Sequence, residues 1–307
     1  MQRRSAFISF QRSMWERHAW TLRGCDVVEP RPLGSVGTRA RRGMTLSELL
    51  ISLTILSMMS VVLAGMSNAV QSAWSYTKGV EDCDVQAQAA IERIQYMISQ
   101  TGVYDLAGQP TRVGMTVVQR SVGTTLIPDV LVLWTGGRSG GMAATGVQTR
   151  LPTVGELLIY TWNPSNPSQL IEIGFPGQTA TFDFAASDLP TVVANLLSSS
   201  TAEKIPICEN LRLSAMNSGG GNISIGNVRF VLTMTPSDTE LATAAPQTTA
   251  WTQLNWPQGK FSSRSGMRQA TLQIELQAEP DGIVRASDTV SAIPFFGSAS
   301  QRHVYEP

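Results

Sequence analysis

The chain has 307 residues, of which 42% are apolar and 15% are charged, with 23 basic and 23 acidic side chains. This composition excludes a disordered or fibrous protein and is sufficient to bury a hydrophobic core. The zero net charge conceals an asymmetry, because residues 1–43 hold nine Arg against three acids (+6), which leaves a balance of −6 for residues 44–307. Residues 1–43 have no apolar period and contain helix-breaking Pro and Gly, so we interpret them as a leader.

An apolar run follows the leader directly. No charged residue occurs from Leu49 to Thr77. Within this run, Leu49 to Met66 would form a helix of about 27 Å at ~1.5 Å per residue, close to the ~30 Å of a bilayer core. A membrane anchor is therefore predicted, with a cleaved secretory signal and a buried helix of a soluble protein as the alternatives.

The basic residues around the run predict its orientation. Arg39, Arg41 and Arg42 precede it, whereas only Lys78 lies near its far end. Because basic residues favour the cytoplasmic side, we expect the N-terminus in the cytoplasm and the chain after about residue 75 on the other side of the membrane.

Glu48 is an unusual residue for an ordinary anchor, since a carboxylate at the bilayer centre costs on the order of 2.5–3.5 kcal/mol. Its context is Arg41-Arg42-Gly43 followed by Met44-Thr45-Leu46-Ser47-Glu48. This order resembles the processing signal of type IV pilins and of the pseudopilins of type II secretion, with Gly before the cut, a hydrophobic residue at +1 and Glu at +5. Here +1 is Met instead of the commoner Phe, and the leader is long.

The resemblance implies that a prepilin peptidase cuts between Gly43 and Met44 and methylates the new amine of Met44. It also implies a role for Glu48 in assembly, as the partner of a neighbouring subunit's Met44 ammonium in a helix bundle. Two charges that are costly separately in a dry environment offset each other when paired.

The helix is predicted to continue beyond the membrane as an amphipathic segment over 80–101. Apolar residues recur there at three- and four-residue spacing, with most acids and Arg93 on the other face. A glycine cap at Thr101-Gly102 is expected to end it. One continuous helix of roughly 84 Å and a helix interrupted at Ser75 to Gly79 are the two alternatives.

After Gly102 the period shifts toward two, which predicts strands. They are expected at 113–120, 129–134, 156–162, 169–175, 179–184, 210–215, 227–235 and 268–278, with a short helix over 188–198 capped by Asp188. The predicted fold class is α+β, with a long N-terminal helix packed on an antiparallel β-rich head. The expected division is a cleaved cytoplasmic leader (1–43), a membrane-spanning part (44–77) and an extracytoplasmic head (78–307).

The C-terminal third carries a second resemblance. Glu209 to Leu213, Trp251 with Trp256-Pro257, and Met267 to Leu276 follow one another in an order similar to that of the J-type minor pseudopilins. This implies a structural subunit near the tip of a type II secretion pseudopilus, with other pseudopilins and the inner-membrane secretion machinery as partners. A segment over 91–102 also resembles PilW-like minor pilins, which keeps a minor pilin of a type IV pilus or DNA-uptake machine as an alternative. A membrane-anchored extracytoplasmic hydrolase or binding protein is the alternative of another class.

Catalytic and ligand-binding motifs are poorly represented. Gly137-Arg138-Ser139-Gly140-Gly141 fits a hydrolase nucleophile pattern, but only His303 is available after residue 43 to take the proton. We therefore expect no enzymatic activity and no cofactor. No zinc ligand set is present, calcium would need carboxylates gathered by the fold, and the acidic balance opposes nucleic-acid binding.

Cys83 and Cys208 are the only cysteines after residue 43, since Cys25 belongs to the leader. In an oxidising compartment they can pair as a disulfide. Two separately buried thiols are the equal alternative, because unpaired Cys is often buried as a small hydrophobe.

Overall fold

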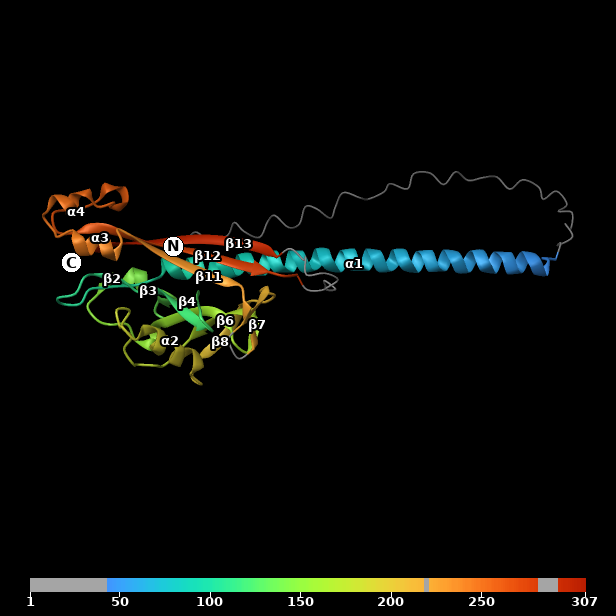
Figure 1. Ribbon diagram of the computed structural model, residues 1–307, viewed down its shortest axis with the longest axis horizontal. Coiled ribbons are helices and arrows are strands. Elements are labelled where there is room, and N and C mark those ends of the chain that lie inside the picture. Colours follow the sequence, from blue (N-terminus) through green and yellow to red (C-terminus); the bar gives the residue numbers. More distant parts are fainter. Residues whose placement is uncertain (1–42, 218–220, 281–291) are drawn as a thin grey trace, which may run out of the picture. The chain divides into compact units, whose positions relative to one another are not determined.

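A computed structural model describes residues 43–217, 221–280 and 292–307 (Figure 1). Of the predicted leader only Gly43 lies within the described residues. The described residues divide into two units at position 61, and the second unit begins at Val62. A long helix and antiparallel sheets form the structure, so the predicted α+β class is confirmed.

Helix α1 (Leu46–Ser99) is continuous over 54 residues, which confirms the single long helix and excludes the alternative of an interruption at 75–79. Its C-terminal part buries a stripe at three- and four-residue spacing, as predicted, formed by Cys83, Ala87, Ala90, Ile91, Ile94, Met97 and Ile98. Gly102 is not a left-handed cap. Glycine is required there because a Cβ atom would lie 3.0 Å from Met142 Cβ and from the Trp134 ring.

Five antiparallel strands form the larger sheet, in the order β3-β4-β6-β7-β8. They are β3 (Met115–Val122), β4 (Thr125–Trp134), β6 (Leu157–Asn163), β7 (Asn166–Gly174) and β8 (Glu203–Cys208). The central strand β6 is buried along almost its whole length. The sheet is therefore covered on both faces, which explains the continuous apolar runs in β4 and β6.

A second antiparallel sheet has the order β11-β12-β13, with β11 (Val228–Thr235), β12 (Gly266–Ala278) and β13 (Ile293–Tyr305). Buried and more exposed residues alternate along β12, so one face of the sheet packs inward. Strand β13 approaches α1 closely at Gly297, where a Cβ atom would come within 2.4 Å of Ile91 Cγ2. Gln95 of α1 also donates a hydrogen bond to the Ser298 carbonyl at 3.0 Å.

Shorter elements complete the unit. A small sheet joins β1 (Val103–Tyr104), β2 (Arg112–Val113) and β5 (Val147–Gln148), and β9 (Leu213–Asn217) pairs with β10 (Asn222–Gly226). The remaining helices are α2 (Leu189–Ser198), α3 (Asp238–Thr243) and α4 (Thr249–Gln253), with 3-10 turns η1 (Met142–Thr145), η2 (Val154–Glu156) and η3 (Pro257–Gly259).

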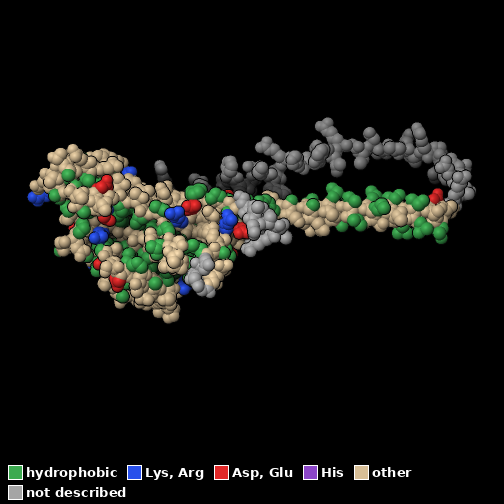
Figure 2. Space-filling model, in the orientation of Figure 1, with side chains coloured by type: hydrophobic (Ala, Val, Ile, Leu, Met, Phe, Trp, Pro, Cys, Tyr) green, Lys and Arg blue, Asp and Glu red, His purple; other side chains and the backbone are tan. Residues whose placement is uncertain are grey.

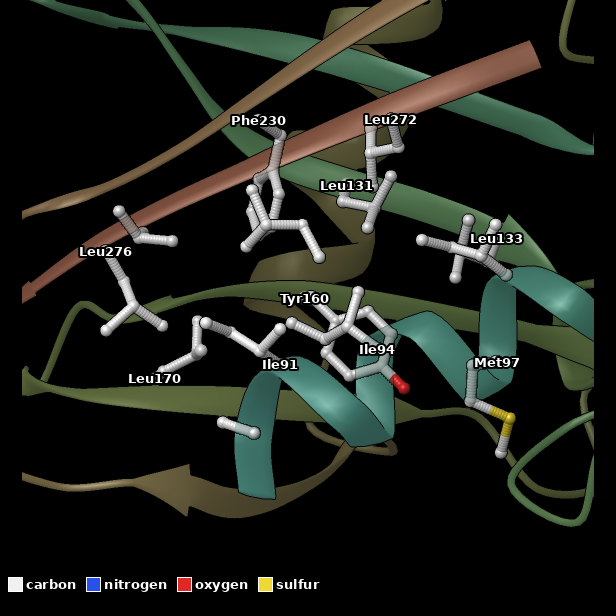
Figure 3. Close-up of a cluster of buried hydrophobic side chains, with 14 of the residues drawn as sticks. Ile91, Ile94, Met97, Leu131, Leu133, Tyr160, Leu170, Phe230, Leu272 and Leu276 are labelled. Carbon is white, nitrogen blue, oxygen red and sulfur yellow. The ribbon is translucent and has the colours of Figure 1, made fainter. Parts of the chain in front are cut away.

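The main core lies where the C-terminal part of α1 meets side chains of both larger sheets. Figure 3 shows Ile94 of α1 near Tyr160 of β6, with Leu272 of β12 facing the same cluster. A second cluster covers the opposite face of the five-stranded sheet, where Val193 of α2 packs with Ile173 of β7. The helix thus serves as the shared core element of the two sheets.

Several sequence predictions of local structure are wrong. Residues 179–184 form no strand, only an isolated bridge between Thr153 and Thr181, because Phe182 and Phe184 turn into a T-shaped aromatic pair. Asp188 precedes α2 as predicted but makes no side-chain cap hydrogen bond. Strands β8, β10 and β13 were not predicted.

Candidate functional site

The N-terminal motif forms a capped helix start. Thr45 is the N-cap of α1, since its carbonyl accepts the Leu49 N–H at 3.2 Å. Its hydroxyl accepts the Glu48 N–H at 3.3 Å, and the Thr45 N–H donates to Glu48 Oε2 at 2.9 Å. The Thr45 hydroxyl also lies 3.0 Å from the same Oε2. This reciprocal capping box places the Glu48 carboxylate at the N-terminus of the helix.

The residues at the expected cleavage point are accessible. Met44 is 65% exposed. A Cβ atom added at Gly43 would meet nothing within 4 Å. No contact in the described part of the chain therefore requires glycine at position 43.

The apolar part of α1 has no protein cover. By length and composition α1 is the one helix in the described residues that could cross a membrane, and its most apolar window, with a mean hydropathy of 2.2, is entirely unburied. Figure 2 shows apolar side chains along this exposed surface. Within it, the Ser52, Thr54, Ser57 and Ser60 hydroxyls each donate to a carbonyl three or four residues earlier. These hydroxyls are thus satisfied without water, as a lipid environment requires.

Aromatic residues mark the end of the uncharged run. Trp74 is 68% exposed and Tyr76 is 51% exposed. The Lys78 ammonium lies 5.8 Å from the centroid of the Trp74 ring. Trp, Tyr and Lys at this position are typical of the boundary between lipid and water.

A buried charge network holds the C-terminal part of α1 against the five-stranded sheet. Arg93 donates to the two carboxylate oxygens of Glu172 at 2.9 and 3.2 Å and to the Arg138 carbonyl at 2.9 Å. Glu172, in β7, is only 3% exposed and also accepts the Tyr160 hydroxyl at 2.8 Å. Arg138 adds a second cation 3.5 Å from Glu172 and pairs with Glu203 at 2.6 Å. We call Arg93, Arg138, Tyr160, Glu172 and Glu203 the helix clamp.

The helix clamp satisfies a carboxylate that would otherwise be costly to bury. Burial raises the pKa of Tyr160, and the adjacent Glu172 raises it further, so the hydroxyl stays protonated as a donor. The sequence places Arg93 on the polar face of the helix, opposite the apolar stripe. In the structure Arg93 reaches from that face to a buried partner 79 positions further along the chain. An acid within the apolar strand around Glu172 was the available signal.

The two cysteines of the predicted disulfide lie in the same unit, and both are buried. Cys83 on α1 is 0% exposed, and Cys208 at the end of β8 is 2% exposed. Burial raises the pKa of Cys208 to about 12, and the nearby Cys83 and Glu209 add to the shift. Gln86, one turn after Cys83, accepts the Glu209 N–H at 3.0 Å. The fold therefore brings the two cysteines into one neighbourhood, and the disulfide stays a prediction.

The loop with the hydrolase-like pattern has a structural role. Arg138 within it belongs to the helix clamp, and the serine is followed only by the short 3-10 turn η1, not by the α-helix that a hydrolase nucleophile needs. His303 is buried on β13. In the described ranges no group of three or more His, Cys, Asp or Glu side chains is arranged to hold a metal ion.

One family description matches the chain: the prokaryotic N-terminal methylation motif, over residues 38–64. No curated protein and no solved structure matches. The matched segment contains the Gly43-Met44 junction, the capping box and the first turns of the apolar helix. It identifies a type IV prepilin-like N-terminus and supports a pilin-like protein that is a substrate of prepilin peptidase and is anchored in a membrane.

The helix clamp predicts a specific stability effect. Arg93→Gln should lower the free energy of unfolding by about 2 kcal/mol, less than the ~3–5 kcal/mol of a fully buried pair, because Arg138 and Tyr160 still contact Glu172. Urea unfolding of the full chain in detergent, followed by tryptophan fluorescence, measures this. The matched control Glu92→Gln, at an exposed neighbouring position, should change stability by less than ~0.5 kcal/mol. Equal effects of the two variants would contradict the clamp.

The cysteines predict a thiol count. If Cys83 and Cys208 are bonded, mature protein that is unfolded without reductant should react with no equivalent of a thiol reagent, and with two after reduction. The bond would close a loop of over a hundred residues and stabilise the head by about 4–5 kcal/mol in the chain-entropy model. Two equivalents before reduction would establish the alternative of two buried thiols.

Proposed function

We propose that this chain is a non-enzymatic minor pseudopilin, an assembly subunit near the tip of a type II secretion pseudopilus. The observation that carries the proposal is the combination on one helix of a prepilin-like motif, an uncovered apolar part and a part buried in a β-rich head. The uncovered apolar surface of such a helix is favourable only in lipid or in contact with other apolar helices. Assembly from the membrane into a helical bundle supplies both environments in succession.

In the proposed sequence of events, the peptidase hydrolyses the bond between Gly43 and Met44 on the cytoplasmic side. The leader 1–43 is released, and the amine of Met44 is methylated. Residues 44–77 then span the inner membrane, and residues 78–307 form the periplasmic head. The cluster of Arg before Gly43 and the aromatic residues at 74 and 76 support this orientation and depth.

The two carboxylate oxygens of Glu48 can serve two roles at the same time. Its Oε2 caps the chain's own helix through Thr45, whereas Oε1 accepts no hydrogen bond within the described residues. In the proposed bundle, Oε1 accepts a hydrogen bond from the Met44 ammonium of a neighbouring subunit. The capping box would hold the carboxylate in one orientation before docking, which lowers the entropy cost of that contact.

The assignment to the J-type subunits is supported by the C-terminal third of the chain. Trp251 and Trp256 lie in the segment that links β11 to β12 and pack with their ring centroids 4.8 Å apart. The order of a strand, a Trp-containing segment and a long apolar strand is the order on which the resemblance rests. The proposed partners are other pseudopilins, prepilin peptidase and the inner-membrane secretion machinery.

Two substitutions separate the charge of Glu48 from its capping role. Glu48→Gln keeps an acceptor for the Thr45 N–H but removes the charge, so processed protein should remain in the membrane and crosslink poorly to partner pseudopilins. Thr45→Val removes the capping hydroxyl but keeps the charge, so crosslinking should persist. The yield of site-specific crosslinks in membranes measures both. Glu81→Gln, an exposed acid on the same helix, is the matched control.

The reverse result would refute the charge pair. Normal crosslinking of Glu48→Gln together with loss for Thr45→Val would mean that Glu48 acts only through its own helix. Loss of processing in Glu48→Gln would place the residue in peptidase recognition instead.

A further inference from the structure

A polar cavity of about 420 Å³ lies in the unit formed by 62–307, beside α3 and the end of β13. Figure 1 shows β2 and α3 close to one another within this unit. Strand β2, the last residues of β13, the start of β12 and helix α3 provide its walls. The side chains that matter for its chemistry are Thr111, Arg112, Asp238, Leu241, Arg268 and Tyr305.

Two arginines line the cavity. Arg268 is only 3% exposed, and its Nε donates to the Pro236 carbonyl at 2.9 Å. Arg112 contributes a buried Nε that has no hydrogen-bond acceptor among the described residues. The Arg268 guanidinium lies 5.5 Å from the centroid of the Tyr305 ring. Burial raises the pKa of Tyr305 while Arg268 and Arg112 act against that shift, so both cations lie within electrostatic range of its hydroxyl.

The only acidic side chain that lines the cavity together with these two cations is that of Asp238. Asp238 pairs with Arg268 at 2.7 Å, but its side chain is 79% exposed and forms no ion pair with Arg112 within the described residues. The cavity therefore carries a net charge of +1 from Arg112, Arg268 and Asp238. The Arg112 side chain makes no hydrogen bond or ion pair within the described residues, so its guanidinium is available to an acceptor in the cavity.

We propose that this cavity binds a carboxylate group, which accepts hydrogen bonds from Arg112 and lies within the field of Arg268. A planar monoanion matches both the fork geometry of a guanidinium and the single excess positive charge. A phosphate dianion would overcompensate that charge and approach Asp238, so it is disfavoured. The carboxylate comes either from an acidic side chain of a partner protein or from a small organic acid, and the experiment below separates the two sources.

The test uses the purified full chain in detergent and a short peptide with two adjacent glutamates, labelled with an uncharged dye. Fluorescence anisotropy should show saturable binding of this peptide and none of the same peptide with glutamines. Arg112→Gln should weaken binding at least tenfold, as expected for loss of a charge-assisted hydrogen bond. Arg302→Gln is the matched control. Arg302 lies on the exposed face of β13, and its substitution by Gln removes the same charge. It should change affinity less than about twofold.

A second variant should act in the opposite direction. Asp238→Asn removes the internal competitor for Arg268 and should tighten peptide binding by about three- to tenfold. Unchanged melting temperatures of the variants would show that they are folded. Displacement of the peptide by millimolar propionate would identify a small carboxylate as a sufficient ligand, whereas resistance to propionate would identify an acidic segment of a protein. Equal binding of the glutamine peptide, or equal effects of Arg112→Gln and Arg302→Gln, would overturn the proposal.

Discussion

The burial of one stripe of α1 between two sheets is the contact on which the rest of the head depends. Ile94 and Met97 of this stripe are completely buried, and the strands that cover them come from both the five-stranded and the three-stranded sheet. Removing the helix would expose the inner faces of both sheets together. The helix clamp fixes the rotation of α1 about its axis, because Arg93 reaches Glu172 in only one rotational orientation of the helix.

The N-terminal part of the same helix carries an apolar surface that the head does not cover. This part exposes large apolar side chains such as Leu56 at 64% and Val61 at 73%, with hydroxyls turned back onto the helix backbone. Such a surface is unfavourable in water and neutral in lipid or against other apolar helices. The prepilin-like motif and the uncovered surface therefore both favour a protein that is anchored in a membrane and assembles through this helix.

Physical pattern explains which parts of the structure could be predicted. The helix and strands β6, β7 and β12 follow from periodicity, since their residues are apolar and face a core. Strand β13 escaped prediction because Gly297, Ser298 and Ser300 resemble a loop in sequence, although Gly297 is what allows contact with Ile91. Strand β8 lies at a sheet edge and contains Pro206, which argues against a strand in most contexts.

The sites divide in the same way. The capping box of Thr45 and Glu48 is local, and its Thr-x-x-Glu spacing was an available signal, although only Glu48 was singled out from the sequence. The helix clamp joins residues 79 positions apart, and the cavity with Arg112 and Arg268 is built from segments still more distant in sequence. Charged residues in such sites cannot be distinguished from solvated ones by sequence, because only the fold determines whether they meet a partner.

The most direct test of the account is the intact mass of the protein from membranes of cells with and without prepilin peptidase. With the peptidase, we expect a species that begins at Met44 and carries the additional mass of one methyl group on its N-terminal amine. Without it, the precursor should retain residues before Gly43. A protein from peptidase-containing cells that keeps those residues, or is cut at any other bond, would contradict the assignment.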